Sequence, residues 1–360
     1  MDESAATRHD PVVITGCGWV TPHAAGRIAH VLAAAEAASR DRSASGFLPV
    51  PDALLAAACP GATEVAHNKG AHLTAVGVRL ALEEAGITHH QKEASSAAAP
   101  TDVPPERIGL VLGCALAGQL GMMRFATEVR EQSARFVSPI NFPQTVGNHI
   151  AGAMARAFNL RGVNLTLAGP AAGLAAIHEA VALLAANQAD LVLAGGTDEL
   201  TAEVASALGS SGAPWSEGAC WFALERESRA AARAAGTLAR IVSSRAGRLG
   251  RDAAATGATG ALWSVCEVGP RGAVFVPAWI GHNLAAAGPS ALAAAIGAVH
   301  GCHVPLIDSA DPRRIASGTP AGGPAPGGDD MTRVVAFAGA GGAADARVEV
   351  DVPPPRGRPD

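Results

Sequence analysis

The chain has 360 residues, of which 49% are hydrophobic and 16% charged, which is enough apolar material for a large buried core in one or two joined domains. Its formal net charge of −5 gives no positive field for nucleic acid or an anionic membrane surface, so we expect neither as a partner. The cysteines are scattered without a CxxC pair, and several lie in apolar runs, which favours buried free thiols in a reducing cytosol over disulfides or a metal site.

The amino-terminal segment does not have the pattern of a signal peptide, because residues 1–10 are acidic and contain no apolar run. The longest apolar stretches further along are interrupted by polar residues such as His178 and Glu179, which argues against a membrane span. We therefore expect a cytoplasmic protein.

The amino-terminal half alternates predicted strands and helices. Residues 12–15 indicate a buried central strand that ends in glycines, and residues 71–87 have helical apolar spacing with Gly86 at the expected carboxyl end. A surface loop rich in Ser, Pro and Ala follows at residues 89–106, and a strand is predicted within 107–118. Such alternation predicts a layered α/β fold.

Residues 164–180 (NLTLAGPAAGLAAIHEA) raise the central question of the sequence. A short β-rich run reaches a turn of small residues and enters an amphipathic helix, an arrangement in which enzymes often display a nucleophile at the helix amino terminus. The turn consists of Gly169, Pro170, Ala171, Ala172 and Gly173, and none of these side chains is nucleophilic. Either the site was never catalytic, or a catalytic fold has lost its reactive atom.

The remaining segments continue the alternation. Residues 186–200 predict a buried strand with a double glycine, and residues 218–244 predict a strand, a charged helix and a further strand. Residues 309–330 are rich in Pro and Gly and predict a loop. Residues 333–350 predict two strands around a glycine-rich turn, and a tight hairpin is favoured over nucleotide binding because no strand-GxGxxG-helix order and no Walker lysine is present.

Taken in order, these segments resemble the β-ketoacyl synthases of fatty-acid and polyketide assembly. The residues that carry the resemblance are VVITGCGWVTP (12–22), the dimer-interface and channel segment 138–167, ADLVLAGGTDE (189–199), the histidine-bearing stretch 281–306 and the glycine-rich loop 336–344. The resemblance implies an α/β thiolase-like fold of two αβαβα halves in five layers, truncated in the second half. We place the first half at 11–245, the shortened second half at 246–352 and a disordered tail at 353–360.

The same resemblance implies that the catalytic apparatus is lost. Active members use a Cys thiolate to accept an acyl group, and two histidines with a supporting Lys to decarboxylate a malonyl thioester. Here the Cys position falls on Ala171, or on Pro170 if the one-residue deletion near the turn is placed later. His282 matches the second histidine and is interpreted as a structural remnant, whereas Pro277 stands at the Lys position. No histidine lies between His178 and His282 to match the first, and this interval is shorter than in active relatives.

Chain-length factors of discrete-subunit polyketide systems keep this fold, lack the Cys and pair with an active ketosynthase, and the present sequence resembles them. The resemblance implies a non-catalytic subunit that forms a heterodimer with a ketosynthase and shapes the tunnel for a growing polyketide or polyene chain on an acyl carrier protein, without metal or cofactor. The Gln that usually replaces the lost Cys in those subunits is missing here. The alternative is a stand-alone acyl-thioester decarboxylase or acyltransferase that uses His282 or a thiol such as Cys114.

Two sets of residues carry the partner prediction. One is the dimer interface predicted from the resemblance, for which ordinary core packing is the alternative. It consists of Phe142 together with residues that helical spacing puts on one side, namely Val146, Ile150, Ala153, Met154 and Ala157. The other is the face formed by Gln119, Met122 and Ala126, which the resemblance places along the far end of the tunnel. For Met122 the alternative is ordinary core, and for Gln119 a solvated position.

Overall fold

The computed structural model describes residues 10–39, 46–60, 68–87, 103–116, 118–139, 141–209, 214–247, 262–268, 273–274, 283–302, 304–308, 311–318, 331–340 and 343–354.

The strands are β1 (Val12–Val20), β2 (Ala25–Gly26), β3 (Phe47–Leu48), β4 (Ile108–Cys114), β5 (Asn164–Ala168), β6 (Leu191–Asp198), β7 (Trp215–Ser216), β8 (Gly218–Arg226), β9 (Ala239–Ala246), β10 (Leu262–Val268), β11 (Ala273–Val274), β12 (Val304–Asp308), β13 (Asp311–Gly318), β14 (Thr332–Ala340) and β15 (Ala343–Val352). The helices are α1 (Ile28–Ser39), α2 (Asp52–Ala58), α3 (Lys69–Glu84), α4 (Gln119–Gln132), α5 (His149–Ala157), α6 (Ala172–Ala185), α7 (Ala202–Leu208), α8 (Glu227–Ala232) and α10 (Ala287–Val299), with short 3₁₀ turns η2 (Pro105–Arg107), η3 (Phe142–Thr145) and η6 (Leu284–Ala286).

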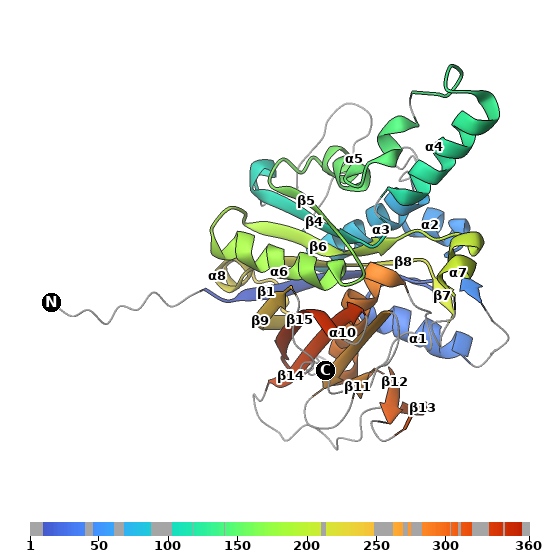
Figure 1. Ribbon diagram of the computed structural model, residues 1–360. Coiled ribbons are helices and arrows are strands. Elements are labelled where there is room, and N and C mark those ends of the chain that lie inside the picture. The colour runs from blue at the N-terminus through green and yellow to red at the C-terminus, as the bar shows by residue number, and fades with distance from the viewer. Residues whose placement is uncertain are drawn as a thin grey trace.

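One mixed sheet runs through the molecule in the order β13-β12-β11-β10-β14-β15-β9-β1-β8-β6-β4-β5, with β2 paired to β1. Strand β4 is parallel to both β5 and β6, whereas β6, β8, β1 and β9 pair antiparallel in turn. The sheet folds around two central helices (Figure 1), because α6 packs on β4 and β6 and also on β9 and β15, while α10 packs on β10 and β14 and also on β8. Helix α3 covers the other face of β1 and β8.

Two apolar layers follow from this arrangement. Along β8 the side chains alternate, so that Cys220, Phe222 and Leu224 join the core around α6 and α10, while Ala219 and Trp221 join the core under α3. Because both faces of the central strands are covered, these strands are apolar along most of their length, and their polar residues, such as Thr15, Asp198 and Glu225, are buried.

Most of the elements predicted from the sequence are confirmed. The helix predicted at 71–87 is α3, and Gly86 follows it in a left-handed conformation with φ 69°. The strand, turn and helix predicted at 164–180 are β5 and α6, and the hairpin predicted at 333–350 is β14 and β15. The loop prediction for 309–330 is wrong in part, because 311–318 form β13 and pair with β12. Residues 313–317 contain neither Pro nor Gly, so nothing in them opposes a strand.

The prediction that the first strand stops at its glycines is also wrong. Strand β1 continues past Gly16 and Gly18 to Val20, with a shift of register beside Gly16. The glycines let α3 lie directly on the strand, because a Cβ at Gly18 would be 1.9 Å from the carbonyl oxygen of Gly77. Close approach of a helix backbone is thus the reason for these glycines, rather than the end of the strand.

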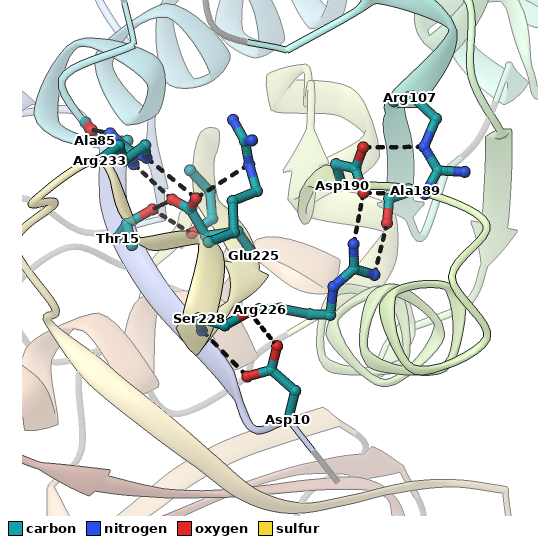
Figure 2. A network of polar contacts seen from close by, with 12 residues as sticks. Asp10, Thr15, Ala85, Arg107, Ala189, Asp190, Glu225, Arg226, Ser228 and Arg233 are labelled. Atoms are coloured by element: carbon teal, nitrogen blue, oxygen red, sulfur yellow. Dashed lines mark hydrogen bonds and ion pairs between the residues drawn. The ribbon is translucent and has the colours of Figure 1, made fainter. Parts of the chain in front are cut away.

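A buried carboxylate fixes the end of β8 against β1 (Figure 2). Glu225 is fully buried, and its carboxylate accepts a hydrogen bond of 2.7 Å from the Thr15 hydroxyl and one of 2.5 Å from the guanidinium of Arg233. The same guanidinium donates to the carbonyl of Ala85 at the end of α3. Glu225 and Arg233 therefore join β8, β1, the end of α3 and the chain after α8, and the buried carboxylate is both paired and hydrogen-bonded.

A second cluster in Figure 2 holds the carboxyl end of α6. Arg226 donates to the carboxylate of Asp190 at 2.5 Å, as Figure 2 shows, and it also donates to the carbonyl of Leu184 at 3.0 Å. Asp190 also pairs with Arg107, and this guanidinium, followed by Arg226, holds the pKa of Asp190 below its usual value. A cation at the negative end of the helix dipole stabilises α6.

We expect Gly18→Ala to destabilise the protein strongly, because the new methyl group would overlap the backbone of α3. The expected loss is on the order of 2–4 kcal/mol in the free energy of unfolding, measured by urea denaturation. The matched control is Gly236→Ala, where a Cβ would meet nothing within 4 Å. Equal midpoints for the two variants would show that α3 does not rest on β1 in this way.

Candidate functional site

The candidate site is the turn between β5 and α6. Gly169 has φ 129°, a conformation that favours glycine, and it leads through Pro170 to Ala171, which is the residue before the first turn of α6. The helix amino terminus would favour a negative charge at this point. Ala171 is buried and its methyl group offers no nucleophile, so the elbow geometry is present without a reactive atom.

The opposite wall of the elbow is η6, which precedes α10. A Cβ at Gly173 would lie 2.1 Å from the carbonyl oxygen of Ala285, and a Cβ at Gly196 would lie 2.4 Å from the same oxygen. On the sheet side, a Cβ at Gly113 would lie 2.3 Å from the carbonyl carbon of Ala172. The backbones of β4, β6, α6 and η6 are therefore in direct contact beside the elbow.

Asp198, the last residue of β6, is the central charged group of this region. Its carboxylate accepts hydrogen bonds from the backbone N–H groups of Ala115 and Leu116, both at 3.0 Å, and from that of Ala285 at 2.8 Å. Burial raises the pKa of Asp198 to about 6, although the backbone donors work in the opposite direction. Asp198 thus joins the loop after β4 to η6 from inside the protein.

The sequence reasoning missed Asp198. The signal that could have found it is an acid placed directly after a buried strand and a double glycine (LAGGTD), where a carboxylate has no solvent and must meet donors.

Cys114 lies next to this carboxylate. Its thiol donates to Oδ1 of Asp198 at 3.2 Å. Burial first, and then the negative charge of Asp198, raise the pKa of the Cys114 thiol well above its usual value. Because the thiolate is the nucleophilic form, this cysteine is held in its unreactive state.

The residues implied as catalytic remnants in the second half, Pro277 and His282, lie outside the described residues. The described chain resumes at Asn283, whose side-chain amide donates to the hydroxyl of Ser290 at 3.3 Å. The indole of Trp19 donates to the same hydroxyl at 3.0 Å. The start of α10 is thereby tied to β1.

The residues predicted to line a tunnel, Gln119, Met122 and Ala126, lie on α4 and are all exposed in this chain. Met122 is 50% exposed, so the ordinary-core alternative for it does not hold within this chain.

The predicted interface residues divide into three groups. Ala153 and Met154 are buried in the chain's own core under α3, so the core alternative is correct for these two. Ile150 and Ala157 are half-buried against the same core. Phe142 and Val146 are 56% and 44% exposed.

The helical face inferred for Val146 to Ala157 is correct only from His149 onward. Phe142 starts η3, with Pro143 in its first turn, and Val146 precedes α5, which begins only at His149. Residues Gly147 and Asn148 form a turn between them, which is typical of these residue types.

Beyond the site, Cys17, Cys59, Cys114 and Cys220 are buried thiols, and Cys302 is half-buried. Within the described ranges, no group of His, Cys, Asp and Glu side chains has the arrangement of a metal site. No described helix combines the length and the apolar character that crossing a membrane requires.

Comparisons with known proteins agree with the resemblance seen in the sequence. Residues 66–220 match the family model of the beta-ketoacyl synthase N-terminal domain. The 3-oxoacyl-[acyl-carrier-protein] synthase 1 of Haemophilus influenzae is 28% identical over 140 residues, which are 38% of this chain and 32% of that protein. The match therefore spans about a third of the length of that curated relative.

Two solved structures show the fold over almost the whole chain. One, described as the ishigamide ketosynthase/chain length factor, has a TM-score of 0.69 and 16% identity, and the match covers 96% of this chain and 99% of that one. The other, a type II polyketide synthase acyl-carrier protein in complex with its ketosynthase bound to the hexaketide, has a TM-score of 0.67 and 14% identity, with 96% and 100% covered. The α/β thiolase-like fold expected from the sequence is confirmed.

We expect Asp198 to give the stability a distinct pH dependence. Its pKa is about 6 in the folded chain and about 3.9 in an unfolded one, so the folded state binds this proton more tightly. The contribution of this group to stability is therefore full below about pH 4, falls as the pH rises through 4 to 6, and is constant above that. The total change is on the order of 2–3 kcal/mol.

In Asp198→Asn this slope should be absent, so the difference in the free energy of unfolding between wild type and variant should change from pH 4 to 6, measured by urea unfolding at pH values from 4 to 7.5. Asp190→Asn is the control, because the pKa of Asp190 is lowered, so its contribution changes only below about pH 4 and the wild-type slope between pH 4 and 7.5 should be retained. A wild-type slope unchanged in Asp198→Asn would contradict the assignment.

Proposed function

We propose that the chain, whose residues 66–220 match the beta-ketoacyl synthase N-terminal domain, acts in polyketide assembly as a non-catalytic chain-length-factor subunit. It pairs with an active ketosynthase, and the two subunits shape the tunnel for the chain that grows on an acyl carrier protein. The observation that carries the proposal is the elbow at Ala171, where the strand, the turn and the helix are kept and the nucleophile is not.

The similar structures support the proposed partners. One of them names a ketosynthase together with a chain length factor, and the other names an acyl carrier protein in complex with its ketosynthase. The division of the chain at 245/246, with a shortened second half, is part of the same proposal.

An exposed apolar face supports a protein partner. Most of the large exposed apolar side chains among the described residues lie between 119 and 168, namely Met122, Met123, Phe136, Phe142, Val146 and Leu165. Strand β5, which carries Leu165, is the last strand of the sheet path on this side and pairs there with β4. An apolar patch beside a sheet edge is typical of a surface that another chain covers.

On this proposal the interface consists of Phe142 and Val146, with Ile150 and Ala157 at its margin. Ala153 and Met154 would act indirectly, because they are buried and anchor α5 to the core of this chain. Gln119, Met122 and Ala126 occupy the exposed side of α4 and are the candidates for the tunnel end.

The alternative is acyl transfer by this chain alone. The surroundings of the described thiols Cys17 and Cys114 argue against it. Cys114 faces a carboxylate and has a raised pKa, and the pKa of the Cys17 thiol is raised well above its usual value by burial and by its neighbour Cys220. A thiol held neutral is a poor acceptor for an acyl group.

The first test is incubation with an acyl-carrier thioester followed by intact-protein mass spectrometry. We expect no covalent adduct on this chain, because the elbow at Ala171 carries no nucleophile and the described thiols Cys17 and Cys114 have raised pKa values, while an active ketosynthase in the same tube gains the mass of the acyl group. A stoichiometric adduct on this chain would overturn the non-catalytic assignment.

The second test addresses pairing. Phe142→Glu together with Val146→Glu should reduce recovery of a co-expressed ketosynthase at least about 30-fold, because two charges would be buried at an apolar interface. The matched control is Val242→Glu, which lies on β9 and is equally exposed at 44%. Size exclusion with light scattering measures the complex, and equal recovery in both variants would place the interface elsewhere.

A further inference from the structure

Helix α4 is weakly anchored to the rest of the chain. Of its residues only Leu120 is buried, and its most extensive contacts are with η3. Phe125 of α4 meets Phe142 of η3 edge to face, with ring centroids 5.8 Å apart. Figure 1 shows α4 at the periphery, away from the sheet. An element that buries so little apolar surface opens at low free-energy cost.

Both ends of α4 have backbone suited to a hinge. Gly118, directly before the helix, has φ 75°, and Ser133, directly after it, has φ 68°. A left-handed residue breaks the helix geometry within one position. Gly118 and Ser133 are therefore the candidate hinge positions about which α4 would turn as a unit.

A small cavity of about 30 Å³ lies beneath α4, with space for about one water molecule. Leu120, Gly121 and Arg124 line it from the helix, and Cys114 and Asp198 line it from the sheet. Cys114 is only 4% exposed, and it lines this cavity together with residues of α4. Displacement of α4 would open this polar cavity and its thiol to solvent.

One ion pair joins α4 to the body of the protein above this cavity. The carboxylate of Glu199 is 10% exposed, accepts a hydrogen bond of 2.9 Å from the backbone N–H of Gly70 in the first turn of α3, and pairs with the guanidinium of Arg124. Arg124 is 54% exposed, so solvent competes for it. The Glu199 carboxylate is thus held by the backbone of α3, whereas its cationic partner Arg124 belongs to α4.

We propose that α4 is a hinged cover over the cavity at Cys114, and that the Arg124–Glu199 pair is the latch that holds it closed. This inference does not depend on the proposed function.

The test uses the rate at which N-ethylmaleimide labels each cysteine of the intact chain, read by peptide mass spectrometry. Arg124→Gln should speed labelling of Cys114 by about 3- to 10-fold, because a pair with one exposed partner contributes modestly to the closed state. Glu199→Gln should have the same effect, and the double variant should add little to either single one. Arg124→Lys should restore the slow rate.

The chain offers internal controls. Cys220 is fully buried in the central sheet and reports global unfolding, whereas Cys302 is half-buried and reports reagent activity. Arg130→Gln removes the same charge later in α4 and should leave the Cys114 rate unchanged. Amide hydrogen exchange should rise over 119–132 in Arg124→Gln. An unchanged Cys114 rate in Arg124→Gln, or acceleration of Cys114 and Cys220 together, would overturn the latch.

Discussion

The packing of α6 against η6 and α10 depends on one backbone contact at the centre of the molecule. The carbonyl oxygen of Ala285 occupies the space that the Cβ atoms of residues 173 and 196 would fill, so only glycine is tolerated at both positions. This contact sets how close α6 comes to η6 and thus to α10, which begins directly after it. The sheet folds around this helix pair, and the apolar layer between them contains many alanines, whose small side chains allow the approach.

The polar groups of the elbow serve this packing. Three backbone N–H groups converge on the carboxylate of Asp198, and they come from the loop after β4 and from η6. In an enzyme of acyl transfer, convergent donors stabilise charge that develops on a substrate. Here the carboxylate of Asp198 accepts the three donors, and burial together with this charge raises the pKa of the neighbouring Cys114 thiol.

Helix α4, at the periphery of the molecule, is far less covered than the central strands. Whereas the central strands are covered on both faces, α4 buries one side chain and exposes methionine side chains to solvent. Its attachment relies on contact with η3 and on an ion pair that solvent can reach. A rigid centre with a weakly attached apolar periphery is the distribution expected where a second protein completes the structure.

The sequence by itself determined the local elements and the missing nucleophile, because a strand, a turn of small residues and an amphipathic helix are all encoded within residues 164–180. Helical spacing likewise located α3. The tertiary structure decided which apolar residues are covered by this chain: periodicity put Met154 and Val146 in one group, yet the first is core and the second is exposed, since only the position of α3 distinguishes them. It also decided that Gly18 lies inside β1 and that Asp198 has three backbone donors. Those donors belong to segments far apart in the chain, and their convergence follows from the folding of the sheet around α6 and α10.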